Sequence, residues 1–123
     1  MPIRFEVLPH ERFVRVTYVG RITLRDVSVH VQRLVDAALI NRPKLVDSRG
    51  ATLALSPQDL RILSSLMVTV RAEYGRAPVA FVAGDESWSA AANLYQDLGA
   101  GAIPRFATFL DLKAAEAWLA SEI

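Results

Sequence analysis

The last third of the chain alternates between strand-like and helix-like apolar patterns with few residues between them. Residues 78–83 (PVAFVA) are almost continuously apolar, which is typical of a strand covered on both faces. Residues 104–109 (PRFATF) form a second strand-like run, and Asp111 is placed to cap a final helix. The helix between the two runs has an inward face made of Trp88, Ala91, Tyr95 and Leu98. Strands joined through such a helix are expected to be parallel.

The N-terminal part predicts a hairpin followed by a helix. Residues 3–8 and 12–19 alternate apolar and other side chains, and the residues between them suit a hairpin turn. Gly20 is expected to end the second strand. Thr23 can cap a helix, with Asp26 placed three residues later as in a capping box. The apolar face of this helix consists of Leu24, Val27, Val31, Leu34, Val35 and Ala38.

The middle of the chain adds another strand and another helix. Residues 44–48 (KLVDS) predict a short strand, and residues 49–55 predict a loop with some extended character. Ser56 and Pro57 start a helix that Gly75 ends. The inner face of this helix consists of Leu60, Leu63, Met67, Val70 and Tyr74. The full order predicts one α/β domain over residues 1–123: a single five-stranded mixed sheet, with the first strand antiparallel and the rest mainly parallel, covered by four helices.

Composition excludes several classes of protein. The 123 residues carry a net charge of +1 and no cysteine, and 52% of them are hydrophobic. The balanced charge argues against a nucleic-acid partner, and the lack of cysteine excludes disulfides, thiolate catalysis and zinc–sulfur sites. We find neither a signal-peptide pattern nor a stretch near the roughly 20 apolar residues of a membrane span. We therefore expect a cytoplasmic protein with no membrane span.

Polar side chains gather where the predicted parallel strands end. Functional groups in open α/β sheets collect at the carboxyl ends of the strands, and this edge is expected to carry Asp47, Ser48, Arg49 and Asp85. Asp85 also suits a plain helix cap, which needs no ligand. The candidate binding residues are Asp47, Ser48, Arg49, Ser56, Asp85 and Trp88.

No pattern for catalysis or a cofactor accompanies these residues. A Ser–His–Asp triad needs a histidine at the same edge, but His10 falls in the hairpin turn and His30 on the first helix, where a surface role is expected. No pair of ligands at helical spacing suggests a metal. The GAGA segment at 99–102 lacks the phosphate-loop lysine and precedes a strand, so it is interpreted as a helix stop. We expect a protein that is not an enzyme, with no catalytic residues, cofactor or metal.

Several segments together resemble one family. They are LVDSR at 45–49, PVAFVAGD at 78–85, and the ending with Phe109, Asp111, Ala115, Trp118 and Leu119. With the order of elements, these are similar to the SpoIIAA-like proteins, small bacterial domains related in fold to STAS domains (sulfate transporter and anti-sigma factor antagonist). The resemblance covers nearly the whole chain, and its most specific part is the Phe–Asp–Ala–Trp–Leu ending.

The resemblance implies a regulatory module that binds a partner protein and has no assigned catalysis. STAS domains are sometimes switched by phosphorylation of a Ser or Thr at the start of the second helix, and the closest position here is Ser56. The surrounding LALSPQDL differs from the Asp-Ser-Ser-Gly type of motif, so a plain helix cap is the alternative. Many relatives also carry an Arg in the third helix, where this chain has Ala92, Asn93 and Leu94.

A second interpretation comes from the likeness of this fold to the lipid-binding Sec14 type. It implies an apolar pocket between the sheet and the helices that holds a small, lipid-like ligand. Trp88, Tyr95 and Met67 are the candidates to line it, with ordinary core packing as the alternative. The expected partner is therefore a protein or a small apolar molecule.

Four apolar residues lie outside the main inward faces of their helices. They are Val29, Ile40, Ile62 and Val68. If they are exposed together, they mark a surface for a partner or a second copy of the chain. A homodimer is the corresponding prediction.

Overall fold

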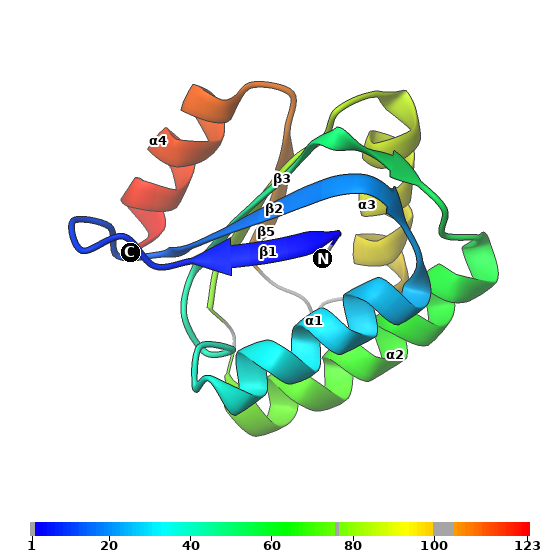
Figure 1. The fold of residues 1–123 in the computed structure, drawn as a ribbon, viewed down its shortest axis with the longest axis horizontal. Helices are drawn as coiled ribbons and strands as arrows, with labels where there is room; N and C mark the ends of the chain where they lie inside the picture. The colour runs from blue at the N-terminus through cyan, green and yellow to red at the C-terminus, as the bar shows by residue number, and fades with distance from the viewer. Residues whose placement is uncertain (1, 76, 100–104) are drawn as a thin grey trace.

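The computed structural model describes residues 2–75, 77–99 and 105–123. One five-stranded sheet has its strands in the order β1-β2-β3-β4-β5, with β1 antiparallel to β2 and every other pair parallel (Figure 1). Four helices complete the predicted α/β fold. The elements are β1 Ile3–Glu6, β2 Val14–Ile22, α1 Leu24–Asp36, β3 Lys44–Leu53, α2 Pro57–Tyr74, β4 Val79–Val82, α3 Glu86–Gly99, β5 Phe106–Phe109 and α4 Leu112–Glu122.

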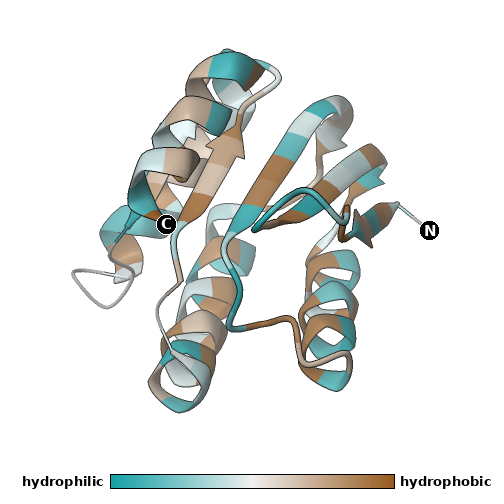
Figure 2. Cartoon of the chain, turned by 90° about the vertical axis from the view of Figure 1, so that its left-hand side faces the viewer, coloured by the Kyte–Doolittle hydropathy of each residue, from teal (hydrophilic) through white to brown (hydrophobic). Residues whose placement is uncertain are grey.

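The strand order decides which face of the sheet each helix covers. Because the strands follow one another in the sheet as they do in the chain, right-handed crossovers place α1, α2 and α3 on the same face. Their buried side chains join one large core cluster, which includes Leu34, Leu63 and Trp88. Helix α4 covers the other face, where Ala115 and Leu119 form a smaller cluster with β3 and β4. Figure 2 shows this division from the side, with α1 presenting the mixed hydrophobic and hydrophilic surface of an amphipathic helix.

The predicted helix starts are confirmed. At α1 the Thr23 hydroxyl accepts a hydrogen bond from the Asp26 backbone amide at 3.3 Å. The Asp26 carboxylate in turn accepts one from the Thr23 backbone amide at 2.9 Å. Ser56 and Asp59 make the same reciprocal pair at α2, with Pro57 at the first helical position. Asp111 accepts the amide of Ala114 at the start of α4. Each cap satisfies amides that the first helical turn leaves without a partner.

The lengths of the central strands differ from the prediction. Strand β2 continues through Gly20 to Ile22, and β3 runs for ten residues to Leu53 instead of ending at residue 48. The two strands stay paired because β3 absorbs one extra residue: Thr17 faces Asp47 and Val19 faces Gly50, so two residues of β3 oppose one of β2. This bulge lets the pair bend and extend past the end of β4.

Other details of the predicted elements also change. The first strand ends at Glu6, two residues earlier than expected. Helix α1 ends at Asp36, and Ala38 has a left-handed φ of 58°, so it does not continue the helical face. Tyr74 and Leu98 lie in the last turns of α2 and α3 and are exposed, contrary to the prediction. The predicted strand start at residue 104 lies outside the described residues, as do positions 100–102 of the GAGA segment.

Candidate functional site

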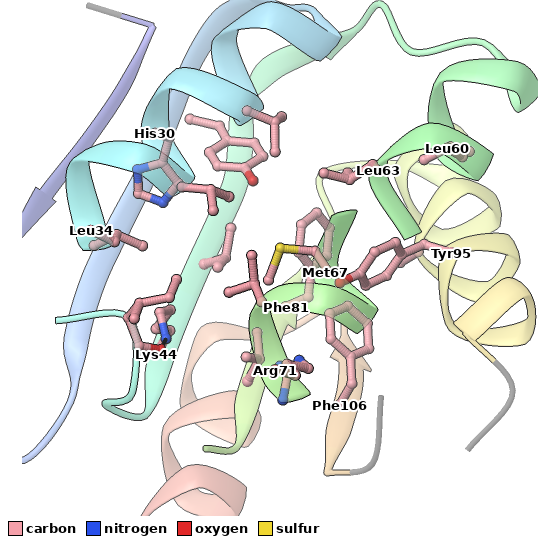
Figure 3. Close-up of a pocket in the computed structure, with 18 of the residues that line it drawn as sticks. His30, Leu34, Lys44, Leu60, Leu63, Met67, Arg71, Phe81, Tyr95 and Phe106 are labelled. Carbon is pink, nitrogen blue, oxygen red and sulfur yellow. Dashed lines mark hydrogen bonds between the residues drawn. The ribbon is translucent and has the colours of Figure 1, made fainter. Parts of the chain in front are cut away.

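Helix α2 stands away from the sheet. Its main backbone neighbours are α3 and α1 and not a strand, so only side chains fill the space beneath it. A cavity of about 130 Å³ remains in this space, between the sheet and helices α1, α2 and α3 (Figure 3). The cavity follows from the topology, because three crossover helices share one face and the middle one bridges its two neighbours.

Most of the wall of this cavity is apolar. Helix α2 contributes Leu60, Leu63 and Met67, and the sheet contributes Phe81 and Phe106 (Figure 3). The aromatic side chains contact one another, with the Phe81 and Phe106 ring centroids 6.2 Å apart. Such a wall favours an apolar occupant over water, because water needs polar partners.

The three residues that the sequence suggested for a pocket all line this cavity. Trp88 is 2% exposed, and its indole Nε1 donates to the carbonyl oxygen of Ala51 at 3.0 Å. That bond fixes the ring at the wall. Tyr95 stands on α3 and Met67 points inward from α2 (Figure 3).

One end of the cavity is cationic. Lys44 at the start of β3 and Arg71 near the end of α2 are 9% and 7% exposed, and both line the cavity (Figure 3). No Asp or Glu is present among the described lining residues. The ammonium of Lys44 donates to the carbonyl oxygens of Ile40 at 2.6 Å and Arg42 at 2.8 Å. Burial, and then the charge of Arg71, lower the pKa of Lys44 to about 7.

Arg71 spans the space between the end of α2 and the aromatic wall. Its Nη1 donates to the carbonyl oxygen of Ala77 at 3.3 Å. Burial raises the pKa of the Tyr95 hydroxyl to about 12, and the charge and hydrogen bond of Arg71 oppose that rise. The guanidinium therefore lies next to the phenol and supplies a permanent positive charge at this end of the cavity.

The expectation of a surface role for His30 is wrong. His30 is 7% exposed and lines the cavity from α1, with its ring 6.1 Å from that of Phe5. Burial lowers its pKa to about 4, helped by the positive charges of Lys44 and Arg33. The imidazole is therefore neutral at pH 7. Ile40, suggested as part of an exposed surface, is also buried at the cavity wall.

The residues predicted at the carboxyl edge of the sheet, Asp47, Ser48, Arg49 and Asp85, are called the rim here. The structure brings some of them together. The Ser48 hydroxyl is fully buried in the β3 bulge, where it donates to the Val82 carbonyl oxygen at 2.7 Å and accepts the Gly84 amide at 3.2 Å. A Cβ added to Gly84 would lie 2.9 Å from the Cα of Arg49, so β3 approaches the turn after β4 very closely. Ser48 thus joins the two strands and presents no free hydroxyl.

The charged members of the rim pair with each other. Arg49 donates to the Asp47 carboxylate through Nε at 2.9 Å and Nη2 at 2.8 Å. This hydrogen bond from Arg49 lowers the pKa of Asp47 below its ordinary value. Asp85 accepts the amide of Trp88 at 3.0 Å as a helix cap, and Ser56 is occupied in its own capping box. A binding role for these rim residues stays a prediction.

Sequence reasoning missed the basic end of the cavity, although a signal was present. Arg71 follows Met67 by four residues, so it continues the inward face of α2, and Lys44 precedes Val46 by two and shares its side of β3. His30 lies three residues after Val27 and four before Leu34 on the inward face of α1. A charged residue on an apolar stripe is the pattern that would have indicated them.

The comparisons with known proteins establish the class of fold. An uncharacterised DUF3478 family protein with a SpoIIAA-like fold, from Shewanella loihica PV-4, matches with a TM-score of 0.57 at 23% sequence identity. The match covers 95% of this chain and 91% of that chain. No family model and no curated protein match the chain. The protein therefore has a SpoIIAA-like fold, as its sequence suggested. In the described part of the chain, no helix is long and apolar enough to cross a membrane.

Proposed function

We propose that this protein is a non-catalytic binding module that holds a small apolar molecule in the cavity beneath α2, as a carrier or a sensor. The observation that carries the proposal is the cavity itself, which lies between the sheet and the three helices and has mostly apolar walls. Close packing is the rule in protein interiors, and an unfilled, mostly apolar space under a helix is typical of a small-molecule site.

The volume sets the size of the ligand. An engineered apolar cavity of about 150 Å³ in another protein accepts benzene, so about 130 Å³ suits a body of roughly six carbon atoms. Longer chains require α2 to move outward, and α2 is free of extensive backbone packing on the strands. Transfer of the ligand from water contributes roughly 25 cal/mol per Å² of apolar surface removed.

The test is native mass spectrometry of purified protein, followed by titration with toluene. We expect either a copurifying small molecule or saturable toluene binding. Ala92→Leu places bulk at the cavity wall, whereas Ala90→Leu on the exposed side of α3 is the matched control. The first should weaken toluene binding at least about fivefold and the second should leave it unchanged. A protein that carries no small molecule and shows no saturable toluene binding would refute the proposal.

The non-catalytic part of the proposal is supported by how the rim residues are used. The Ser48 hydroxyl makes hydrogen bonds to the backbone of Val82 and Gly84, and the Asp47 carboxylate is paired with Arg49. A screen for hydrolase and transferase activity tests this part. Robust turnover that disappears in Asp47→Ala or Ser48→Ala would identify an enzyme instead.

A regulatory module that binds a protein, as in STAS domains, is the second candidate. It is favoured by the exposure of Val29, Ile62 and Val68, which are 41%, 47% and 37% exposed. Affinity purification from the native host distinguishes the two functions. A partner lost on Ile62→Glu but retained in Ala92→Leu would support protein binding, whereas the reverse would support the cavity.

A further inference from the structure

We infer that the ligand of the cavity is an anionic amphiphile, a compact apolar body carrying a carboxylate, and that the carboxylate binds Lys44 and Arg71. This inference rests on the proposed function and specifies its ligand class. The two cationic side chains lie at one end of the cavity, and Leu60 and Leu63 lie at the other (Figure 3). Leu60 and Arg71 are separated by roughly 16 Å along α2, at 1.5 Å per residue.

The two basic residues at this end of the cavity favour an anionic ligand. Two basic side chains that are more than nine-tenths buried face the same space, and the described lining residues include no acid. Burial beside Arg71 disfavours the charged form of Lys44, and an anion in the cavity favours that form again. A carboxylate there also makes charge-assisted hydrogen bonds to both groups.

The donors are suited to a carboxylate. Lys44 uses two of its three N–H donors on the carbonyl oxygens of Ile40 and Arg42, so the same ammonium can give its third to a group in the cavity. The guanidinium of Arg71 already donates to the carbonyl oxygen of Ala77, and its planar fork of N–H donors matches the geometry of a carboxylate. Neutral His30 adds a polar group without positive charge at pH 7.

The apolar end argues against a purely ionic ligand. Leu60, Leu63 and Met67 line the cavity from one face of α2, and Phe81 closes it from the sheet. An inorganic anion would leave these side chains facing an empty space. A six-carbon carboxylic acid places its head at the basic end, at the start of β3, and its chain against Met67 and Phe81.

Three probes with the same apolar chain separate charge from size. Hexanoate, 1-hexanol and hexylamine are anionic, neutral and cationic at pH 7, and their dissociation constants are measured by ligand-observed NMR. We expect hexanoate to bind about tenfold to a hundredfold more tightly than 1-hexanol, the range of charge-assisted hydrogen bonds. Hexylamine should bind most weakly.

Variants test whether Lys44 and Arg71 cause the preference. Lys44→Met and Arg71→Met each keep the apolar stem and remove the charge, so each should reduce the ratio of hexanoate to 1-hexanol affinity to about threefold or less. Arg61→Met, on the exposed side of α2, is the matched control and should keep the ratio. If either variant fails to fold, the ratio in the unchanged protein and the shift of the Lys44 ammonium resonance on adding hexanoate decide the matter.

The outcomes separate this inference from the proposed function. Binding of 1-hexanol at least as tight as that of hexanoate overturns the inference and leaves the apolar-ligand function standing. A hexanoate preference that survives both Lys44→Met and Arg71→Met overturns the assigned carboxylate site. If none of the three probes binds, the inference fails, and the toluene titration decides whether the proposed function stands.

Discussion

Acid should destabilise this protein through His30. The imidazole is 7% exposed and packs near the ring of Phe5, and it has a pKa of about 4 because of burial first and then the nearby charges of Lys44 and Arg33. Asp26, on the same helix, is occupied by the amide and hydroxyl of Thr23. In the unfolded chain the same group has an ordinary pKa of about 6.5.

The sign and size of the effect follow from these two pKa values. The folded pKa is the lower one, so the unfolded chain binds a proton first as the pH falls below about 6.5, and stability is lost until about pH 4. At pH 5 the unfolded imidazole is almost fully protonated and the folded one only about a tenth. The difference amounts to a loss of about 2 kcal/mol between pH 8 and pH 5.

Urea unfolding at the two pH values measures this loss. His30→Gln should lose about 2 kcal/mol less than the unchanged protein between pH 8 and pH 5, because it lacks the titrating group. His10→Gln, at an exposed position in the hairpin, should lose as much as the unchanged protein. Equal losses in His30→Gln and the unchanged protein would refute the reasoning. So would an NMR titration that places the pKa of His30 at or above 6.5.

Three further predictions concern the rim and the surface. Gly84→Ala should cost about 1–3 kcal/mol, because its Cβ meets backbone of β3 at 2.9 Å, whereas Gly50→Ala meets only an ordinary contact at 3.6 Å; urea midpoints compare them. Ser48→Ala should lower the free energy of unfolding by about 1–3 kcal/mol, since it leaves the buried Val82 carbonyl oxygen and the part-buried Gly84 amide without this partner, and an unchanged value would contradict this. A homodimer is predicted from the apolar surface, so light scattering should show a folded monomer for the Val29→Glu, Ile62→Glu double variant; an unchanged protein that is monomeric at high micromolar concentration excludes the dimer.

Most of the fold could be predicted from the sequence because its signals are local. The caps at Thr23, Ser56 and Asp111 depend on residues three positions apart, and the run at 78–83 reflects burial on both faces. The length of β3 could not be predicted in this way. Its second half is a strand only because β2 continues beyond Gly20 and offers partners across a bulge, and such pairing is not local.

The residues of the candidate cavity were predicted only in part, because the cavity depends on tertiary packing that local patterns do not show. Trp88, Tyr95 and Met67 were indicated as pocket residues, but Lys44 and Arg71 were missed because long basic side chains are rarely buried. The rim followed from a rule for sheets whose strand order reverses, where a crevice opens at the carboxyl edge. Here the order runs from β1 to β5 without reversal, and the cavity lies under α2. A binding role at the rim stays a prediction.

The sheet separates two hydrophobic clusters, so the two faces can be changed independently of each other. The cavity belongs to the larger cluster, while Ala115 and Leu119 of α4 hold the smaller one on the opposite face. Substitutions on the two faces share few partners, so their effects on stability should add. The cavity wall can therefore be redesigned while the packing of α4 on the opposite face is kept, which makes this small domain a suitable scaffold for designed binding sites.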